Sequence, residues 1–254
     1  MDEHECSGKI AKGLKDLGVL PGDAVLVHSS FKSLGYVPGG METVIQGFLN
    51  AIGTDGTLLF PALSLGLGST DIFDVRLTPS NVGAMPEYFR TREGVSRSVH
   101  PTHSVCALGR RASELLDDHI LDSTPCGGNS PFHKLAETNG KIVMLGCGLK
   151  PNTTMHALEE YVEPPYLFGP VRSYAIRDHQ RAAFQKEYRT HNFKGYEQRY
   201  DKVMELDTGS FLRKGRALQA VTYVLDAPNL KRAVLNKMKS DVCFFVEEIP
   251  QKQA

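Results

Sequence analysis

Apolar residues recur along the chain in two spacings, one typical of helices and one typical of buried strands. Apolar positions three or four residues apart predict helices over residues 10–17 and 41–52. Uninterrupted apolar runs predict short strands at residues 24–28 and 57–61, one on each side of the second helix. A parallel strand pair needs a crossover of about a dozen residues or more, and residues 29–55 supply it. This part of the chain therefore predicts a strand, a helix and a second strand parallel to the first.

Two further apolar runs predict that the parallel sheet continues. Residues 105–108 and 142–145 are apolar throughout, as parallel strands covered on both faces usually are. The later part of the chain predicts antiparallel strands at residues 171–176 and 220–225, a polar helix near 196–204 and a last apolar run at 243–246. We therefore expect one α/β domain over residues 1–254, with a mostly parallel central sheet and a smaller, mixed C-terminal lobe from about residue 164 onward.

The composition is that of a folded protein without a dominant charge. Hydrophobic residues make up 41% of the chain, and 29 basic residues balance 29 acidic ones, so neither nucleic acid nor an anionic membrane is expected as a partner. No apolar stretch approaches the roughly 18 residues of a membrane helix, and residues 1–5 lack the features of a signal peptide. The five cysteines are scattered without a C-x-x-C pair, so we expect a cytoplasmic protein with reduced thiols.

The first candidate site follows the strand predicted at residues 24–28. His28, Ser29 and Ser30 begin a loop rich in small residues. In open α/β sheets, ligands bind beyond the carboxyl ends of the strands, where backbone N–H groups can face an anion. The loop is therefore a candidate phosphate cradle. The alternative is that its hydroxyl groups only cap and turn the chain.

The second candidate site is a polar cluster at residues 96–104, just before a predicted buried strand. It contains Arg97, His100 and His103 together with several hydroxyl groups. A His-x-x-His pair can bind a metal ion, but such a site needs three or four ligands, and no cysteine or carboxylate lies nearby in the sequence. We therefore expect no metal site here.

The third candidate site is a predicted helix that begins near residue 153. His156 and Glu159 are three residues apart and share one face of that helix, so the carboxylate could orient the imidazole or raise its basicity. His156 is thus a candidate general base, and the alternative is an ordinary surface pair. The sequence lacks the common motifs of hydrolases, NTPases, dehydrogenases and kinases, which weakens those interpretations.

Six sequence blocks in a fixed order carry a resemblance that covers nearly the whole chain. The blocks are Val27-His28-Ser29-Ser30 with Gly35, Gly39 and Gly40; Asp55-Gly56-Thr57 with Phe60-Pro61; Arg97-Ser98 with His100-Pro101 and His103-Ser104; Ser130-Pro131-Phe132 with Lys134-Leu135; Gly140 to Gly146; and Thr154 with His156 and Glu159. In this order they are similar to the aminoglycoside 3-N-acetyltransferase family, whose members transfer an acetyl group from acetyl-CoA to an amine of an antibiotic.

The resemblance implies a family-specific, antibiotic N-acetyltransferase-like α/β fold with acetyl-CoA as co-substrate and no metal. It implies that His156 is the general base, paired with Glu197 or with the nearer Glu159. The acceptor is a small amine that enters from the side opposite CoA, with an aminoglycoside 3-amino group as the first candidate and a homodimer as the candidate assembly. The residues that it places along CoA are His28, Ser29, Ser30, Phe31, Lys32, Ser33, His103 and Ser104.

One departure from the family pattern bears on the acceptor. Members that act on antibiotics often carry an acidic run where this chain has residues 191–195, with Asn192 and Lys194 in place of acids. Aminoglycosides carry several positive charges, so this change weakens the expectation of an antibiotic acceptor. Four acids could still supply negative potential, namely Glu159, Glu160, Glu163 and Asp201.

Two other functions are open at this point. One is a CoA-binding protein without catalysis, which predicts binding with no acetylation across a broad panel of amines. The other is a metal-dependent hydrolase that uses His28, His100, His103 and His156, which predicts stoichiometric metal in the purified protein.

Overall fold

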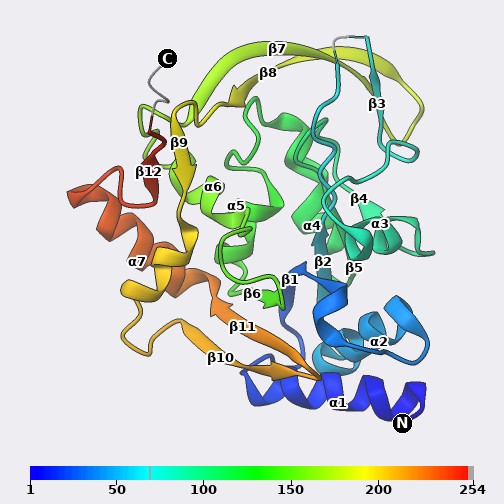
Figure 1. Ribbon diagram of the computed structural model, residues 1–254. Coiled ribbons are helices and arrows are strands. Elements are labelled where there is room, and N and C mark those ends of the chain that lie inside the picture. Colours follow the sequence, from blue (N-terminus) through cyan, green and yellow to red (C-terminus); the bar gives the residue numbers. More distant parts are fainter. Residues whose placement is uncertain (69, 251–254) are drawn as a thin grey trace.

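A seven-stranded sheet runs through the molecule in the order β10-β11-β6-β1-β2-β5-β4 (Figure 1). The computed structural model describes residues 1–68 and 70–250. The strands of this sheet are β1 (Ala24–Ser29), β2 (Thr57–Pro61), β4 (Ser96–Arg97), β5 (Val105–Gly109), β6 (Lys141–Leu145), β10 (Leu212–Ala217) and β11 (Ala220–Asp226).

Most strands of this sheet run in one direction. β1 lies between β6 and β2 and is parallel to both. β11 and β5 join antiparallel on the two sides, and β10 and β4 reverse the direction again, so β10, β6, β1, β2 and β4 share one direction. The predicted α/β class with a mostly parallel central sheet is confirmed. The prediction that residues 105–108 form a parallel strand is wrong, because a continuous apolar run indicates burial on both faces and not strand direction.

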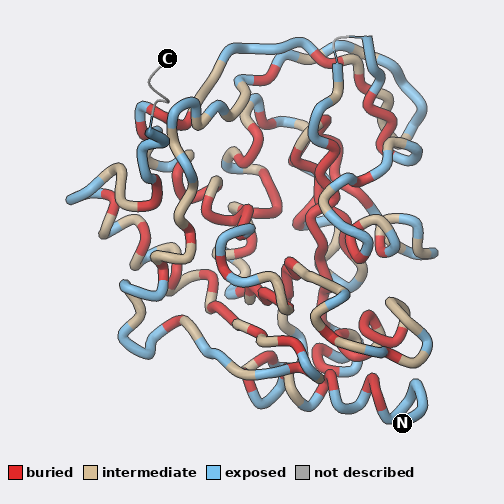
Figure 2. The backbone as a smooth tube through the Cα atoms, viewed as in Figure 1, coloured by how far each residue is buried: buried red, intermediate tan, exposed pale blue. Residues whose placement is uncertain are grey.

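Helices cover both faces of the central sheet, so that the molecule has three layers. Val25 and Val27 of β1 lie in one core with α1, α2 and α3, whereas Ala24 and Leu26 lie in the other core with α4 to α7. Successive strand residues point to opposite faces, which is why one short run serves both cores. Figure 2 shows buried residues concentrated along the sheet and the inner sides of its helices. The helices are α1 (Glu3–Asp16), α2 (Gly40–Ile52), α3 (Ala84–Thr91), α4 (Ala112–Leu116), α5 (Pro131–Glu137), α6 (Thr154–Glu160) and α7 (Ala227–Ser240), with 3-10 turns η1 (Phe31–Leu34), η2 (Asp117–Leu121) and η3 (Tyr200–Glu205).

Aspartate side chains cap the first turns of two helices. Asp2 caps α1 by accepting a hydrogen bond from the backbone N–H of Glu5 at 2.8 Å. Asp226 caps α7 in the same way, accepting from the N–H of Asn229 at 3.1 Å. None of the helices among the described residues is long and apolar enough to cross a membrane.

The part of the chain from residue 164 onward divides between two places. β7 (Phe168–Arg177) and β8 (Ala183–His191) form a long hairpin that joins β3 (Ile72–Asp74) in a separate three-stranded sheet and arches over the top of the molecule in Figure 1. β10, β11 and α7 return to the central sheet and its core. The antiparallel strands predicted at residues 171–176 and 220–225 are confirmed.

The polar helix predicted near residues 196–204 is wrong in its first part. β9 (Tyr196–Gln198) pairs with β12 (Val246–Glu248), and only then does η3 begin. β12 lies about fifty residues further along the chain, so no local spacing could reveal the pairing.

Candidate active site

Two adjoining cavities share His156, near the start of α6. The first has a volume of about 250 Å³ and the second of about 320 Å³, and Leu65, His156 and Gln198 line both. The side chain of His156 keeps 15% of its surface exposed. One imidazole therefore faces two separate binding spaces.

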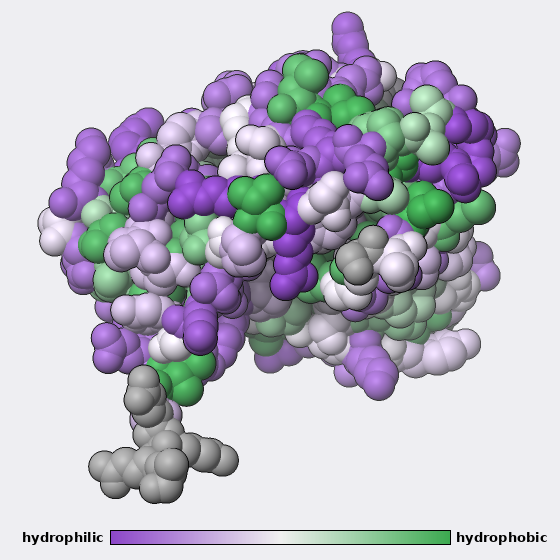
Figure 3. Space-filling model, turned by 90° about the horizontal axis from the view of Figure 1, so that it is seen from above, coloured by the Kyte–Doolittle hydropathy of each residue, from purple (hydrophilic) through white to green (hydrophobic). Residues whose placement is uncertain are grey.

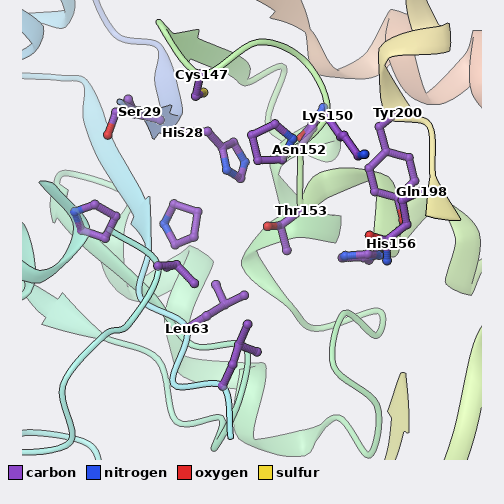
Figure 4. Close-up of a pocket in the computed structure, with 16 residues that line it drawn as sticks. His28, Ser29, Leu63, Cys147, Lys150, Asn152, Thr153, His156, Gln198 and Tyr200 are labelled. Carbon is purple, nitrogen blue, oxygen red and sulfur yellow. The ribbon is translucent and has the colours of Figure 1, made fainter. Parts of the chain in front are cut away.

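The first cavity lies at the carboxyl ends of the three parallel strands. His28 and Ser29 come from the end of β1, Pro61 from the end of β2, and residues 147–153 from the loop after β6. Because the carboxyl ends of parallel strands meet at one edge of a sheet, these three loops converge. Figure 4 shows His28, Leu63, Thr153 and His156 arranged around the same space, with Tyr200 next to His156.

Three buried polar atoms along the first cavity have no hydrogen-bond partner among the described residues. They are His28 Nε2, Ser29 Oγ and Asn152 Nδ2. Asn152 Oδ1 accepts from the backbone N–H of Thr154 at 3.2 Å, which leaves the amide nitrogen unpartnered. Burial lowers the pKa of His28 to about 3, so its imidazole is neutral. Unpartnered buried groups are costly, and amide or hydroxyl groups of a ligand would satisfy them.

His156 is held by a hydrogen-bonded chain that ends in a fully buried carboxylate. The hydroxyl of Tyr200 lies 2.8 Å from His156 Nδ1 and 2.6 Å from Glu159 Oε2. Glu159 is 0% exposed, and the hydroxyl of Tyr166 donates to its other oxygen at 2.9 Å. Burial and the neighbouring carboxylate raise the pKa of Tyr200 well above its ordinary value, so the phenol stays protonated. Its hydroxyl donates a hydrogen bond to Glu159. The oxygen of Tyr200 then accepts from Nδ1–H of His156, which leaves the lone pair on Nε2.

Tyr200 was missed by the sequence reasoning. It lies 44 positions after His156, on η3, and no local motif marks it. The direct contact between His156 Nδ1 and Glu159 Oε2 is longer, at 3.4 Å.

The structure brings Glu159 close to His156 but does not bring Glu197 there. Glu197 is exposed and forms an ion pair with Lys150. It lies on β9, where neighbouring side chains point to opposite faces, and Gln198 is the residue that lines both cavities.

The other residues predicted along CoA occupy several different places. Ser33 Oγ donates to the carbonyl of Ser30 at 2.7 Å, and Phe31 packs against the core, so that η1 forms a tight turn beside the first cavity. Lys32 is exposed on that turn. His103 lines the second cavity. None of the residues from Ser30 to Ser33 lines either cavity.

Ser104 serves a structural role together with Arg97. Arg97 is 5% exposed and donates to Ser104 Oγ at 2.9 Å, to the carbonyl of Ala62 at 2.7 Å and to Ser64 Oγ at 2.9 Å. A further bond reaches the carbonyl of Thr78. The polar cluster at residues 96–104 therefore serves mainly to hydrogen-bond its own loop to the loops that contain Ala62 and Thr78.

Replacing Arg97 with methionine is expected to lower the free energy of unfolding by about 2–4 kcal/mol, because the carbonyls of Ala62 and Thr78 would lose a buried donor. Urea unfolding measures the change. The control is Arg232→Met on α7, where the exposed side chain predicts a change within about 0.5 kcal/mol. Equal effects of the two substitutions would contradict the structural role of Arg97.

A second histidine and carboxylate pair, His191 and Glu160, lies beside the first, and only its histidine lines the second cavity. His191 Nε2 is 2.7 Å from Glu160 Oε1, and the imidazole rings of His156 and His191 are 5.0 Å apart. Burial lowers the pKa of His191 and raises the pKa of Glu160. The ring of His103 lies 5.4 Å from that of His191. Three imidazoles therefore form one wall of this cavity.

The histidines that a metal-dependent hydrolase would use do not form a metal-binding cluster among the described residues. They are His28, His100, His103 and His156. Within residues 1–68 and 70–250, no three or more histidine, cysteine or acidic side chains are placed to hold a metal ion. His100 is 0% exposed and stacks on His119 at 4.8 Å. Its Nδ1 accepts from the backbone N–H groups of Thr102 and His103, so it helps to shape a turn.

Two cavities that share His156 are the arrangement expected of an enzyme with two substrates, of the group-transfer class. A family model described as aminoglycoside 3-N-acetyltransferase matches residues 26–239, and the chain belongs to this family.

Individual relatives agree with this assignment. The chain is 34% identical over 177 residues to aminoglycoside N(3)-acetyltransferase VIII of Streptomyces fradiae, covering 62% of each protein. It is 28% identical over 254 residues to aminoglycoside N(3)-acetyltransferase IX of Micromonospora chalcea, covering 86% of this chain and 88% of that one. A solved mutant of aminoglycoside acetyltransferase AAC(3)-IVa in complex with gentamicin has a TM-score of 0.81 and 27% identity, covering 94% and 90% of the two chains. The matches span about three fifths of the length of the Streptomyces relatives.

Proposed function

We propose that this protein is an acetyl-CoA-dependent N-acetyltransferase with His156 as its general base. The observation that carries the proposal is the imidazole of His156, which lies where two cavities meet and is held through Nδ1 by Tyr200 and Glu159. That arrangement supports a base whose free nitrogen, Nε2, can take a proton from a substrate bound in either cavity.

The proposed reaction uses the hydrogen-bonded chain behind His156. An acceptor amine loses a proton to Nε2 as its nitrogen attacks the thioester carbon. The imidazolium that forms is stabilised by Tyr200 and by the buried carboxylate of Glu159. Collapse of the tetrahedral intermediate breaks the carbon–sulfur bond, and the CoA sulfur takes the proton back from His156. The products are an acetylated amine and free CoA.

We place the pantetheine arm of CoA in the first cavity. Its walls combine apolar side chains, such as Leu63 and Val82, with the unpartnered polar atoms of His28, Ser29 and Asn152. Pantetheine is a slender chain with two amide groups, which need both kinds of surface. The turn from Ser29 to Ser33 lies at the end of β1, where backbone N–H groups and Lys32 could meet the CoA phosphates.

The acceptor then occupies the second cavity. The 3-amino group of an aminoglycoside is the first acceptor to assay, because named relatives are aminoglycoside acetyltransferases. We further propose that the enzyme acts in the cytoplasm, where its five free thiols would stay reduced. A homodimer is the candidate assembly, and light scattering would test it.

Acetyl-CoA is expected to stabilise the protein against heat. At about one hundred times its dissociation constant a ligand adds roughly 2.7 kcal/mol, which raises the Tm of a chain of this size by about 5–10 °C. Thermal unfolding with acetyl-CoA, free CoA and, as a control, ATP would measure the shift. No shift at millimolar acetyl-CoA would contradict the proposed function. A shift without thiol release across a broad amine panel would favour a CoA-binding protein without catalysis.

A further inference from the structure

The second cavity carries positive charge and no carboxylate. Among the described residues that line it, Arg172 and Arg189 bear formal charges, and the other polar groups come from His, Tyr, Thr, Asn and Gln side chains. No Asp or Glu lines the first cavity either, although its Lys150 forms an ion pair with Glu197. Among the described residues a polycationic acceptor would therefore find no lining carboxylate in either space, and in the second it would meet the cation of Arg172.

The carboxylates of Glu159 and Glu160, which lie near these cavities, already accept hydrogen bonds from groups of the protein. Glu159 accepts from the hydroxyls of Tyr166 and Tyr200. Glu160 accepts from a threonine hydroxyl, from a backbone N–H and from His191. Both carboxylates are buried deeply enough that they offer no open oxygen to a ligand ammonium group.

Arg172 is the arginine that is open to a ligand. It is exposed on β7 and forms no ion pair with any carboxylate among the described residues. Arg189 on β8 differs, because Glu163 lies 3.2 Å from its guanidinium and the ring of Phe168 stacks on it at 3.9 Å. Figure 3 views the molecule from the β7–β8 side and shows a mostly hydrophilic face with scattered apolar patches.

A buried hydroxyl without a partner lies beside Arg172. Tyr188 is 2% exposed, lines the second cavity, and its hydroxyl makes no hydrogen bond to any described residue. Arg172 pairs directly with Tyr188 across the β7–β8 ladder. Opposed residues of antiparallel strands point to the same face, so both side chains lie on the face of the hairpin that lines the second cavity, together with Tyr174.

We propose that the acceptor is an amine on a molecule that also carries an anionic oxygen group, a phosphate or a carboxylate, bound by Arg172 and Tyr188. A guanidinium and a phenol hydroxyl together present several donors to such a group, and the amine would then face His156. This inference rests on the proposed acetyltransferase function and narrows its acceptor to a class unlike the polycationic antibiotics.

A matched set of amines tests the inference. Glucosamine, glucosamine 6-phosphate and muramic acid share an amino sugar and differ in the presence of a phosphate or a carboxylate, and gentamicin represents the polycations. With the full-length enzyme and thiol release as readout, kcat/KM is expected to be at least about tenfold higher for the anionic amines than for glucosamine. The phosphate and carboxylate arms distinguish the two sources of the anion.

Variants identify the residues responsible. Arg172→Glu is expected to abolish the preference for the anionic amines, and Tyr188→Phe to reduce it about threefold to tenfold, while the KM for acetyl-CoA stays within about twofold. Arg232→Glu makes the same change of charge on α7, which lines neither cavity, and should leave the preference intact.

Three results would overturn the inference. One is a higher kcat/KM for gentamicin than for the anionic amines. Another is a rise in the KM for acetyl-CoA in Arg172→Glu with unchanged acceptor preference, which would assign Arg172 to the CoA phosphates. The third is the absence of thiol release with every amine despite a thermal shift with acetyl-CoA, which would overturn the proposed catalytic function as well.

Discussion

Replacing His156 with alanine is expected to lower kcat by about 10²- to 10⁴-fold, the usual contribution of a general base. Of the residues that line both cavities, His156 is the one that can take a proton at neutral pH, and a buried carboxylate supports its imidazole through Tyr200. Because His156 is partly exposed and lies on the short helix α6, its loss should leave the fold and the binding of acetyl-CoA nearly unchanged. Thiol release measures kcat, and calorimetry measures the dissociation constant of acetyl-CoA.

Two comparisons sharpen this experiment. Tyr200→Phe removes one hydroxyl and keeps the base, so kcat should fall by only about tenfold. His4→Ala makes the same substitution at an exposed position on α1 and should have no effect on kcat. Turnover in His156→Ala close to that of the unmodified enzyme would show that another group takes the proton, and His191 would be the next candidate because its ring is 5.0 Å away.

Acid is expected to unfold this protein earlier than its neutral balance of charge suggests. The pKa values of His28 and His119 are lowered to about 3 by burial. Those of three more buried histidines, His100, His103 and His191, are also well below the ordinary value. In the unfolded chain each imidazole takes up a proton near pH 6.5, whereas the folded protein keeps it neutral.

The sign of the effect follows from this difference. Below pH 6.5 the unfolded state binds more protons, so the free energy of unfolding falls as the pH falls, by about 1.4 kcal/mol per pH unit for each such histidine. The stability is complete above pH 6.5 and is lost in the window from 6.5 toward 3. Urea unfolding from pH 8 to pH 4.5 should show a flat region and then a steep decline.

A histidine variant tests the origin of the decline. His119→Gln removes one titrating group and should reduce the slope below pH 6.5 by about 1.4 kcal/mol per pH unit, while His4→Gln on the exposed face of α1 should not change it. The experiment compares how steeply the free energy of unfolding changes with pH. A variant that is less stable at every pH therefore still gives an answer. Identical slopes for His119→Gln and the unmodified protein would contradict the assignment.

Local spacing was enough to predict the helices and strands of the first sixty residues. The helix and strand periods between residues 10 and 61 predicted α1, β1, α2 and β2, and crossover length predicted that β1 and β2 are parallel. The same reasoning misjudged the direction of β5 and took β9 for a helix. Both errors concern pairings between distant segments, which leave no mark on the spacing within either one.

The contacts within the site were also predicted only in part. His156 and Glu159 share a helix face, so their pairing could be read from a three-residue interval. Tyr200 reaches the same imidazole from η3, and Arg172 and Tyr188 meet only because β7 and β8 form a hairpin. Glu197 lay one residue from the cavity-facing position, and the alternation of β9 turns it outward to Lys150.

The sequence by itself determined the α/β class, the family and the identity of a histidine and carboxylate pair, because these depend on short-range periodicity and on the order of six motif blocks. The tertiary structure alone decided that two cavities share His156, that a tyrosine joins His156 to Glu159 and that arginine, not carboxylate, lines the second cavity. Charge and burial at a site depend on which distant segments the fold packs together, and that packing is a property of the whole chain.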